Sequence, residues 1–558
     1  MTAGTAQAGK APAGKARTGR PPAGRTHSLA GTGALARLAL RRDRVMIPIW
    51  VIIFVVMAAG SASATVGLYG TVAERAAAAA NLNGTPALVA LYGLVYDEKS
   101  LGAIAMIKMS GLGSAMVAVL AILLMIRHTR TEEEAGRLEL VGSGIVGRHA
   151  PLAAAFVLTA IVNLALGLLT AFGLVSAGLP AAGSFAFGLA WTAIGMAFAA
   201  VAAVTAQVTS SARSATGLAV AVLGVVYVLR AIGDTAGVGG PVWLRWLSPI
   251  GWGQQVRPFA GDRWWVLVVP AAFFVVVAAV AHALVAGRDH GAGLLADRLG
   301  AAEAGPSLRS PLGLAWRLHR GALVSWTAGF VVIGLVFGNV ASNVSDFLDS
   351  ASARDMIQKL GGVQGLTDAF MSTELGMAGV IASVYAVQVV MRLRSEEAEL
   401  RSEPVLATGV SRLSWAWSHL LVALVGTAVL LTAAGLGAGL AAAAVSGDAG
   451  DFWRMLGAAV VRVPAAWVIA GITVAAFGLA PRAVAAGWVA LVAFLLLGEF
   501  GPLFELPQGV MDISPYAHTP RLPGAAFSAT PLVWLVVVTA ALIVVGLVGF
   551  RRRDVPVT

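Results

Sequence analysis

Long apolar runs are the feature that most restricts what this chain can fold into. Twelve stretches approach or exceed the 20 or so residues that a helix needs to cross the hydrocarbon core of a bilayer. They lie near residues 45–64, 101–126, 150–177, 184–208, 214–232 and 264–286, and then near 322–341, 374–392, 416–445, 454–478, 482–498 and 531–550. A backbone in lipid must satisfy its own hydrogen bonds, so such runs predict helices. The sequence predicts an all-α polytopic membrane protein with about twelve transmembrane helices, whose third and ninth are long enough to tilt or break.

Composition excludes several other classes of protein. Charged residues make up 12% of the chain, against about 25% in soluble proteins. The net charge of +11 could suggest nucleic acid, but the basic residues gather in an N-terminal tail and in short loops between apolar runs. The positive-inside rule explains that distribution better, so no nucleic-acid partner is expected. The chain has no cysteine, which excludes disulfides and thiolate metal sites, and we expect no metal site.

The positions of the basic residues also predict an orientation. Arginines precede the first run, follow the second and follow the last, which places all three groups on one side if the number of spans is even. We therefore expect a multi-pass protein of the plasma membrane with both termini in the cytoplasm. Residues 1–30 have no apolar period and no signal-peptide core, so they are predicted to form a disordered basic cytoplasmic tail.

Two charged stretches copy each other inside this apolar chain. Residues 130–139 and 394–403 each carry a pair of glutamates, a later arginine and a further glutamate, at a constant spacing of 264. Arg148 and Arg412 follow at the same spacing. Since six spans separate equivalent points, we infer a parallel duplication about an axis along the membrane normal. The expected organisation is the tail 1–30, a first six-span half 31–286, a cytoplasmic linker 287–311 and a second six-span half 312–558.

Each repeated stretch is predicted to form a charged helix of two to three turns on the cytoplasmic surface. Thr131 can cap a helix whose N3 residue is Glu134, and Glu133 and Arg137 are four apart in the favourable order, as are Glu397 and Arg401. The alternative is a solvated loop helix without a partner. Residues 35–42 and 312–320, before the first span of each half, fit either a helix in the inner interface or an ordinary positive flank.

These loops resemble the coupling-helix region of type-2 ABC exporter permeases. The resemblance implies that six spans make a half-transporter and that the loop between its second and third spans docks on an ATPase subunit. The residues that match are Glu132, Glu133, Arg137, Glu139 and Arg148 in the first half, and Glu396, Glu397, Arg401, Glu403 and Arg412 in the second. The fused twelve-span form is similar to actinobacterial exporter permeases for polyketide antibiotics of the tetronasin type. Pro404 has no counterpart in the first copy, so the second coupling helix is expected to be shorter or bent.

Two stretches resemble phosphate-binding motifs, but neither has the residues and the structural context that its motif requires. The segment 9–16 lacks the Ser or Thr that would hold magnesium, and no strand precedes it. The glycine pattern at 142–147 precedes a membrane span and has no acidic residue about 20 positions on. We therefore expect no cofactor in this chain, and the resemblance implies that two copies of a separate soluble ABC ATPase bind ATP and magnesium.

The resemblance thus implies the permease subunit of an ATP-driven exporter, and the few charges in the spans favour a small apolar or amphipathic cargo. No catalytic residues are expected in this chain. The ionisable residues within or near spans are candidates for a transport pathway, because charge is costly in lipid: Lys108, Arg230, Arg462 and Glu499. Arg230 can instead pair with Asp234. The main alternative is a proton-coupled secondary transporter, in which Lys108 or Glu499 would titrate. A membrane-embedded enzyme is disfavoured because the histidines are scattered.

Two loops on the opposite side, 233–263 and 499–530, are rich in Trp and in Pro respectively. They predict segments that dip at the outer membrane face, a region that caps the exit path in the family that the chain resembles. An aromatic belt at the interface is the other explanation.

Overall fold

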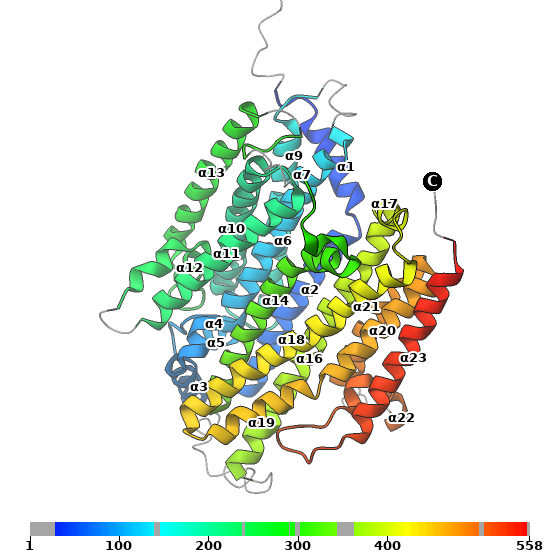
Figure 1. Ribbon diagram of the computed structural model, residues 1–558. Coiled ribbons are helices and arrows are strands. Elements are labelled where there is room, and N and C mark those ends of the chain that lie inside the picture. The colour runs from blue at the N-terminus through cyan, green and yellow to red at the C-terminus, as the bar shows by residue number, and fades with distance from the viewer. Residues whose placement is uncertain are drawn as a thin grey trace, which may run out of the picture. The chain divides into compact units, whose positions relative to one another are not determined.

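The computed structural model describes residues 28–138, 146–236, 240–288, 291–295, 302–342, 362–500 and 507–554. All regular structure in these ranges is helical, and twelve helical segments are long and apolar enough to cross a membrane (Figure 1). The predicted fold class, an all-α protein with twelve spans, is confirmed.

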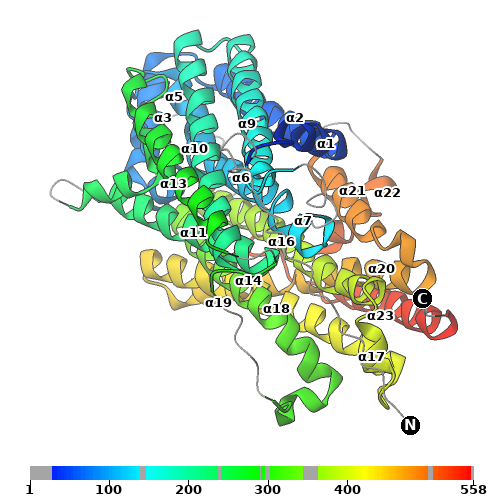
Figure 2. The same cartoon turned by 90° about the horizontal axis from the view of Figure 1, so that it is seen from above.

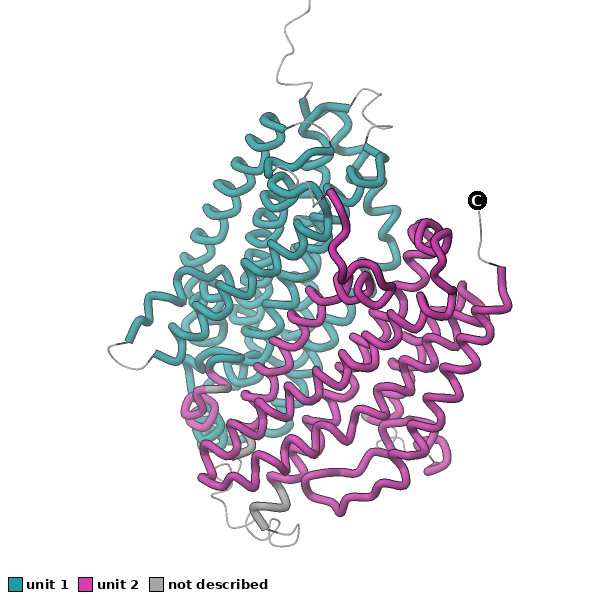
Figure 3. The backbone as a smooth tube through the Cα atoms, viewed as in Figure 1, with its two compact units in different colours: residues 1–79, 90–298 teal, residues 80–89, 299–558 magenta. Residues whose placement is uncertain are grey.

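The chain divides into two compact units, residues 1–79 with 90–298 and residues 80–89 with 299–558 (Figure 3). The helices up to residue 298 are α1 (Thr32–Arg42), α2 (Met46–Leu68), α3 (Val72–Gly84), α4 (Pro86–Tyr92), α5 (Leu101–Lys108), the π-helical η2 (Met109–Gly113), α6 (Ser114–Arg127), α7 (Arg130–Glu134), α9 (Ala150–Ser176), α10 (Ala181–Val208), α11 (Ala212–Thr235), η3 (Val242–Leu247), α12 (Pro249–Gln255), η4 (Trp264–Leu267) and α13 (Val268–Ala286).

The helices after residue 298 all belong to unit 2. They are η5 (Pro306–Arg309), α14 (Pro311–Ser342), α16 (Gly362–Ala398), α17 (Ser402–Leu406), α18 (Arg412–Ser446), α19 (Ala449–Val460), α20 (Val463–Leu479), η7 (Pro481–Ala483), α21 (Ala486–Phe500), α22 (Gln508–Met511), η8 (Pro515–His518) and α23 (Thr530–Arg552).

Within unit 1 the fourth span, α10, is the central helix. It packs against α6, α9, α11 and α13 (Figure 2). Most of its buried residues are alanines and glycines. Small residues permit the close approach of backbones that stabilises helix pairs in lipid, where burial of apolar surface contributes little. At the crossing of α9 and α10, for example, Gly167 and Gly188 face each other so closely that a Cβ on either would collide with the other's carbonyl oxygen.

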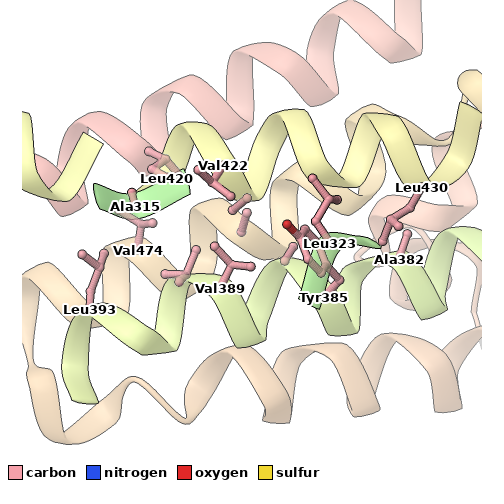
Figure 4. Packing of buried hydrophobic residues seen from close by; sticks show 14 of the residues in the cluster. Ala315, Leu323, Ala382, Tyr385, Val389, Leu393, Leu420, Val422, Leu430 and Val474 are labelled. Atoms are coloured by element: carbon pink, nitrogen blue, oxygen red, sulfur yellow. The ribbon is translucent and has the colours of Figure 1, made fainter. Parts of the chain in front are cut away.

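Unit 2 is organised in the same way around its fourth span, α20. This helix packs against α16, α18, α21 and α23, and α14 lies along α18. The main core lies between α14, α16, α18 and α20, where Leu323, Tyr385, Val389 and Leu430 interlock (Figure 4). The same pairs of spans pack together within each unit: the first with the third, the second with the fourth, the second with the fifth, and the fourth with the sixth.

The interruptions of the spans differ from those expected. The third and ninth spans, α9 and α18, are continuous helices. The second span instead contains the π-helical turn η2, and the tenth breaks at residues 461–462 between α19 and α20. The segment before the first span is a separate helix, α1, in unit 1, whereas residues 312–320 continue into the span as part of α14 in unit 2.

Candidate functional site

The charged loop of unit 1 is tied to the end of the sixth span by a buried ion pair. Glu133, in the short helix α7, accepts hydrogen bonds from Arg288 Nη1 at 2.6 Å and Nη2 at 2.7 Å. Arg288 follows α13 directly, and the two side chains are only 7% and 11% exposed. Such two-point pairing fixes the orientation of both groups and is stronger than a single hydrogen bond. Arg130 adds a further ion pair to Glu133 at 2.9 Å.

The third span joins the same cluster through Arg148, whose Nη2 donates to the carbonyl oxygen of Arg288 at 2.6 Å. The Nε of Arg288 in turn donates to Gln207, at the end of the fourth span, at 2.7 Å. The ends of spans two, three, four and six are therefore held together around Arg288, through its guanidinium and its backbone carbonyl. We call Glu133, Arg148 and Arg288 the first clamp.

Unit 2 contains the same arrangement. Glu397, in the last turn of α16, accepts hydrogen bonds from Arg553 Nη1 at 2.6 Å and Nη2 at 2.7 Å, with its side chain 1% exposed. Arg412, at the start of the third span of this unit, donates to the carbonyl oxygen of Arg553 at 2.8 Å. Arg553 also lies over the rings of Phe477 and Phe550. We call Glu397, Arg412 and Arg553 the second clamp.

The neighbouring glutamates form a second, more exposed layer. Glu132 accepts from Arg137 Nε at 2.7 Å and pairs with Arg42 of α1. Glu396 accepts from Arg401 Nε at 3.3 Å and from Arg392 in its own helix at 3.1 Å. The side chains of Arg137 and Arg401 are 47% and 51% exposed. The outer face of each loop thus presents an arginine to its surroundings.

The predicted pairs Glu133–Arg137 and Glu397–Arg401 are wrong by one position, because each arginine pairs with the glutamate one residue earlier. The cause is the same in both loops. The helix ends early, and the chain reverses through a left-handed residue, Gly136 with φ 67° in one loop and Leu400 with φ 58° in the other. This turn carries the arginine back to the first glutamate of its pair. These two turning residues are also 264 apart.

The predicted helix lengths and capping box are wrong as well. α7 and α17 have five residues each, not two to three turns. α7 begins at Arg130, so Thr131 lies inside it and caps nothing. Glu134 instead accepts from the backbone nitrogen of Ala212, the first residue of α11, at 3.0 Å. Glu403 is exposed in α17, and Glu139 lies outside the described residues.

Asp43, after α1, fixes that helix to the end of the second span. Its carboxylate accepts from Arg127 Nη2 at 2.9 Å, and His128 Nε2 lies 2.7 Å away. Burial alone would raise the pKa of Asp43, but the hydrogen bonds from Arg127 and His128 outweigh it and hold this pKa below its ordinary value. At the corresponding place in unit 2, His319 Nε2 lies 2.9 Å from His419 Nδ1.

The residues considered for a transport pathway have different surroundings. Lys108 is exposed at the end of α5. Arg230 is buried, lies 3.3 Å from Asp234 as expected for a pair, and donates to the carbonyl oxygen of Ala90 at 2.7 Å. Arg462 is buried and donates to backbone carbonyls, including that of Ser372 at 2.5 Å. Glu499 lies in α21, and its side chain is outside the described residues.

The sequence analysis missed Arg288 and Arg553 as members of the site. They lie 155 and 156 residues after their glutamate partners. A signal was present, because each arginine follows the sixth span of its half and precedes an aspartate, at a spacing of 265 that nearly matches the repeat of the loops.

Twelve apolar helices, with a charged loop tied to the end of the last span in each unit, define a polytopic membrane permease. Residues 308–551 match the family described as "Multidrug efflux system permease Rv1217c, C-terminal domain". The chain is also 46% identical over 534 residues, 95% of its length and 96% of its relative's, to the "Multidrug efflux system permease protein Rv1217c" of Mycobacterium tuberculosis. This chain belongs to that family of permeases.

Membership confirms the predicted class, an exporter permease of the ABC type, and a transporter membrane subunit rather than an enzyme. The proton-coupled alternative is not favoured. The similarity to tetronasin-type permeases stays a prediction.

Proposed function

We propose that this chain is the plasma-membrane subunit of an efflux system, in which two copies of a separate soluble ABC ATPase dock on the loops 127–148 and 392–412. ATP and magnesium bind to those subunits, and the cargo is a small apolar or amphipathic compound. The loops and both termini face the cytoplasm. The observation that carries the proposal is that each unit has one clamp between its charged loop and its last span.

The clamps suggest how a movement of the ATPase subunits is transmitted to the membrane spans. An ATPase that moves a loop also moves whatever is rigidly bonded to it. The buried ion pairs bond each loop to the end of span six, and hydrogen bonds from Arg148 and Arg412 link that end to span three. Glu133 and Glu397 are therefore assigned to transmission. The exposed side chains Arg137, Arg401 and Glu403 are assigned to contact with the ATPase.

The near-identical clamps and the matching packing of spans in both units support the proposed duplication. In the proposed arrangement the two halves have the same orientation, so their loops present equivalent faces to two identical ATPase subunits. The cargo assignment rests on the relative, which its name describes as part of a multidrug efflux system.

The experiment separates docking from transmission. The permease is co-purified with a candidate soluble ABC ATPase, and association and ATP hydrolysis are measured for R137E/R401E and for E133Q/E397Q. We expect the first variant to lose the ATPase. The second should retain the ATPase but hydrolyse ATP without its response to transported compounds. Unchanged association in R137E/R401E would contradict docking at these loops, and normal coupling in E133Q/E397Q would contradict transmission through the clamps.

A further inference from the structure

A cavity lies in unit 1 at the end of the second span away from the first clamp. Its apolar wall includes Met106, Ile107 and Phe187, and its polar wall includes Tyr96, Ser110 and Arg257. About 25 helical residues separate Met106 from the loop at Glu132, a distance near 38 Å at 1.5 Å per residue. The cavity and the clamp are therefore at opposite ends of one membrane span.

Arg257 is the unusual member of this lining. Among the described residues its side chain makes no hydrogen bond or ion pair, and its Nε is buried without a partner. Its guanidinium lies over the ring of Tyr96, 4.3 Å from the ring centre. Burial and the nearby charge of Arg263 lower the pKa of Arg257. Arg245 is also close, and Asp262 accepts from the backbone nitrogen of Phe259. No described carboxylate pairs with the guanidinium of Arg257, and two other arginines lie near it. The surroundings therefore favour the binding of an anion at this position.

The backbone around Arg257 is held in a costly conformation. Arg257, Phe259 and Asp262 have φ values of 51°, 64° and 34°, in the left-handed region that side chains rarely adopt. Such a conformation is disfavoured for residues with a side chain, and strain of this kind gathers at ligand-binding sites. Phe259 fits against Gly102 and Gly183, where any Cβ would strike its ring. The fold thus fixes the position of Arg257.

The opposite wall is irregular too. Ser110 belongs to the π-helical turn η2, a feature that is often found at functional sites. Trp191 Nε1 donates to the carbonyl oxygen of Met109 at 3.2 Å, which stabilises the distorted turn. Gln254 Nε2 donates to the carbonyl oxygen of Tyr92 at 2.8 Å and holds the segment that precedes Arg257. Two irregular elements therefore enclose one cavity of mixed apolar and polar lining, and Arg257 is the unpaired cation in that lining.

We propose that this cavity binds the acidic head of an amphipathic anion, which pairs with Arg257, while the apolar body of the anion stays outside, because the cavity holds only about 30 Å³. A guanidinium pairs in two-point fashion with a carboxylate or a phosphate. The buried side chains of Met106, Ile107 and Phe187 keep water away from one side of that pair, which strengthens it. The acidic head can belong to a membrane lipid or to a free amphiphile. The inference does not depend on docking of an ATPase.

The test uses the full chain alone in nanodiscs of neutral phosphatidylcholine, with two photoreactive probes of equal length, dodecanoic acid and dodecanol. Labelled peptides are mapped by mass spectrometry. We expect the acid to label residues 94–110 and 254–260 at least about tenfold more in the wild type than in R257Q, because a hydrogen bond to a charged group contributes about 1.5–3 kcal/mol. The alcohol should label both proteins equally.

R263Q is the matched control for charge without contact. Arg263 is an exposed arginine of the same loop outside the cavity, so its loss should reduce labelling by the acid much less than R257Q does. A103F, which fills the cavity while keeping Arg257, should lose labelling by the acid, and thermal unfolding verifies that both variants fold. Equal labelling of the wild type and R257Q by the acid would overturn the proposal, as would equal labelling by acid and alcohol.

A final arm identifies the source of the anion. The nanodiscs are prepared again with a minor fraction of phosphatidylglycerol. Loss of labelling by the acid in the wild type would identify the occupant as the acidic head group of a lipid. Persistent labelling would identify a free amphiphile as the occupant.

Discussion

At the scale of single residues, the buried pair Glu397–Arg553 should matter more than any exposed pair of the same loop. Glu397→Gln leaves a mostly buried guanidinium without its counter-charge, and such losses cost about 3 kcal/mol. We expect a large fall in the midpoint of thermal unfolding in detergent. Glu399→Gln, at an exposed position, should change it little.

A double variant tests whether the ion pair or only its broken half is responsible. Glu397→Met together with Arg553→Met removes both charges and leaves apolar side chains of similar length. Paired replacement of this kind is often neutral. Recovery of the midpoint by the double variant is expected. A double variant as unstable as E397Q would show that the stabilisation does not come from pairing.

The left-handed turns of the two loops give opposite predictions for equivalent residues. Gly136→Ala should destabilise unit 1 by about 1 kcal/mol, because an L side chain is disfavoured at a φ of 67° although space surrounds the position. Leu400→Gly, at a φ of 58°, should be neutral or stabilising. The midpoints of thermal unfolding of the two variants measure these effects. A change of the same sign in both midpoints would contradict the left-handed geometry that the two turns share.

Asp43 predicts a pH dependence. Because its pKa is lowered in the folded state, its contribution to stability is present above the ordinary carboxyl pKa of about 4 and is lost as the pH falls through the folded value. The difference in unfolding midpoint between wild type and Asp43→Asn should therefore be largest near pH 7 and should shrink below about pH 4. A difference that grows towards acid pH would contradict the assignment.

At the scale of elements, the close approach of α14 and α18 depends on glycines. A Cβ at Gly334 would collide with the carbonyl oxygen of Ala434, whereas nothing lies within 4 Å of a Cβ at Gly329 on the same helix. Gly334→Val should therefore cost about 1–3 kcal/mol through overpacking, and Gly329→Val should cost less. Size-exclusion profiles and unfolding midpoints of the two variants measure the difference. Equal effects would indicate that helix propensity, not packing, dominates.

The elements also show which features of the fold can be predicted from the sequence. Apolar length alone located all twelve spans, since the bilayer imposes that length whatever the packing. Apolar length does not report the π-turn at Met109–Gly113, whose first carbonyl oxygen accepts a hydrogen bond from the indole of the distant Trp191. It also does not report the break at Arg462, although Pro464 at the second position of α20 is a local signal for it, because proline cannot continue the preceding helix. The helices of the charged loops were expected to be longer because the sequence does not reveal the left-handed turns at Gly136 and Leu400.

At the scale of the whole molecule, the repeat identified the loops but not what holds them. Glu132, Glu133 and their counterparts stand out as charges in an apolar chain. The clamp arginines are hidden among the basic residues that follow any last span, and their distance in sequence from Glu133 and Glu397 conceals the pairing. A repeat of charges therefore indicates which residues act together, and the contacts in the structure show how those residues are paired.

The duplication predicts how many ATPase subunits bind. If each loop docks one subunit, Arg137→Glu alone should lower the number bound from two to one, as should Arg401→Glu alone, because each exposed arginine belongs to a different unit. Native mass spectrometry of the complex released from detergent counts them directly. A charge reversal changes the interaction more than truncation does, because it places like charges in contact with the partner. Two subunits retained in either single variant would contradict docking at that loop, and none retained would show that the two loops bind as one site.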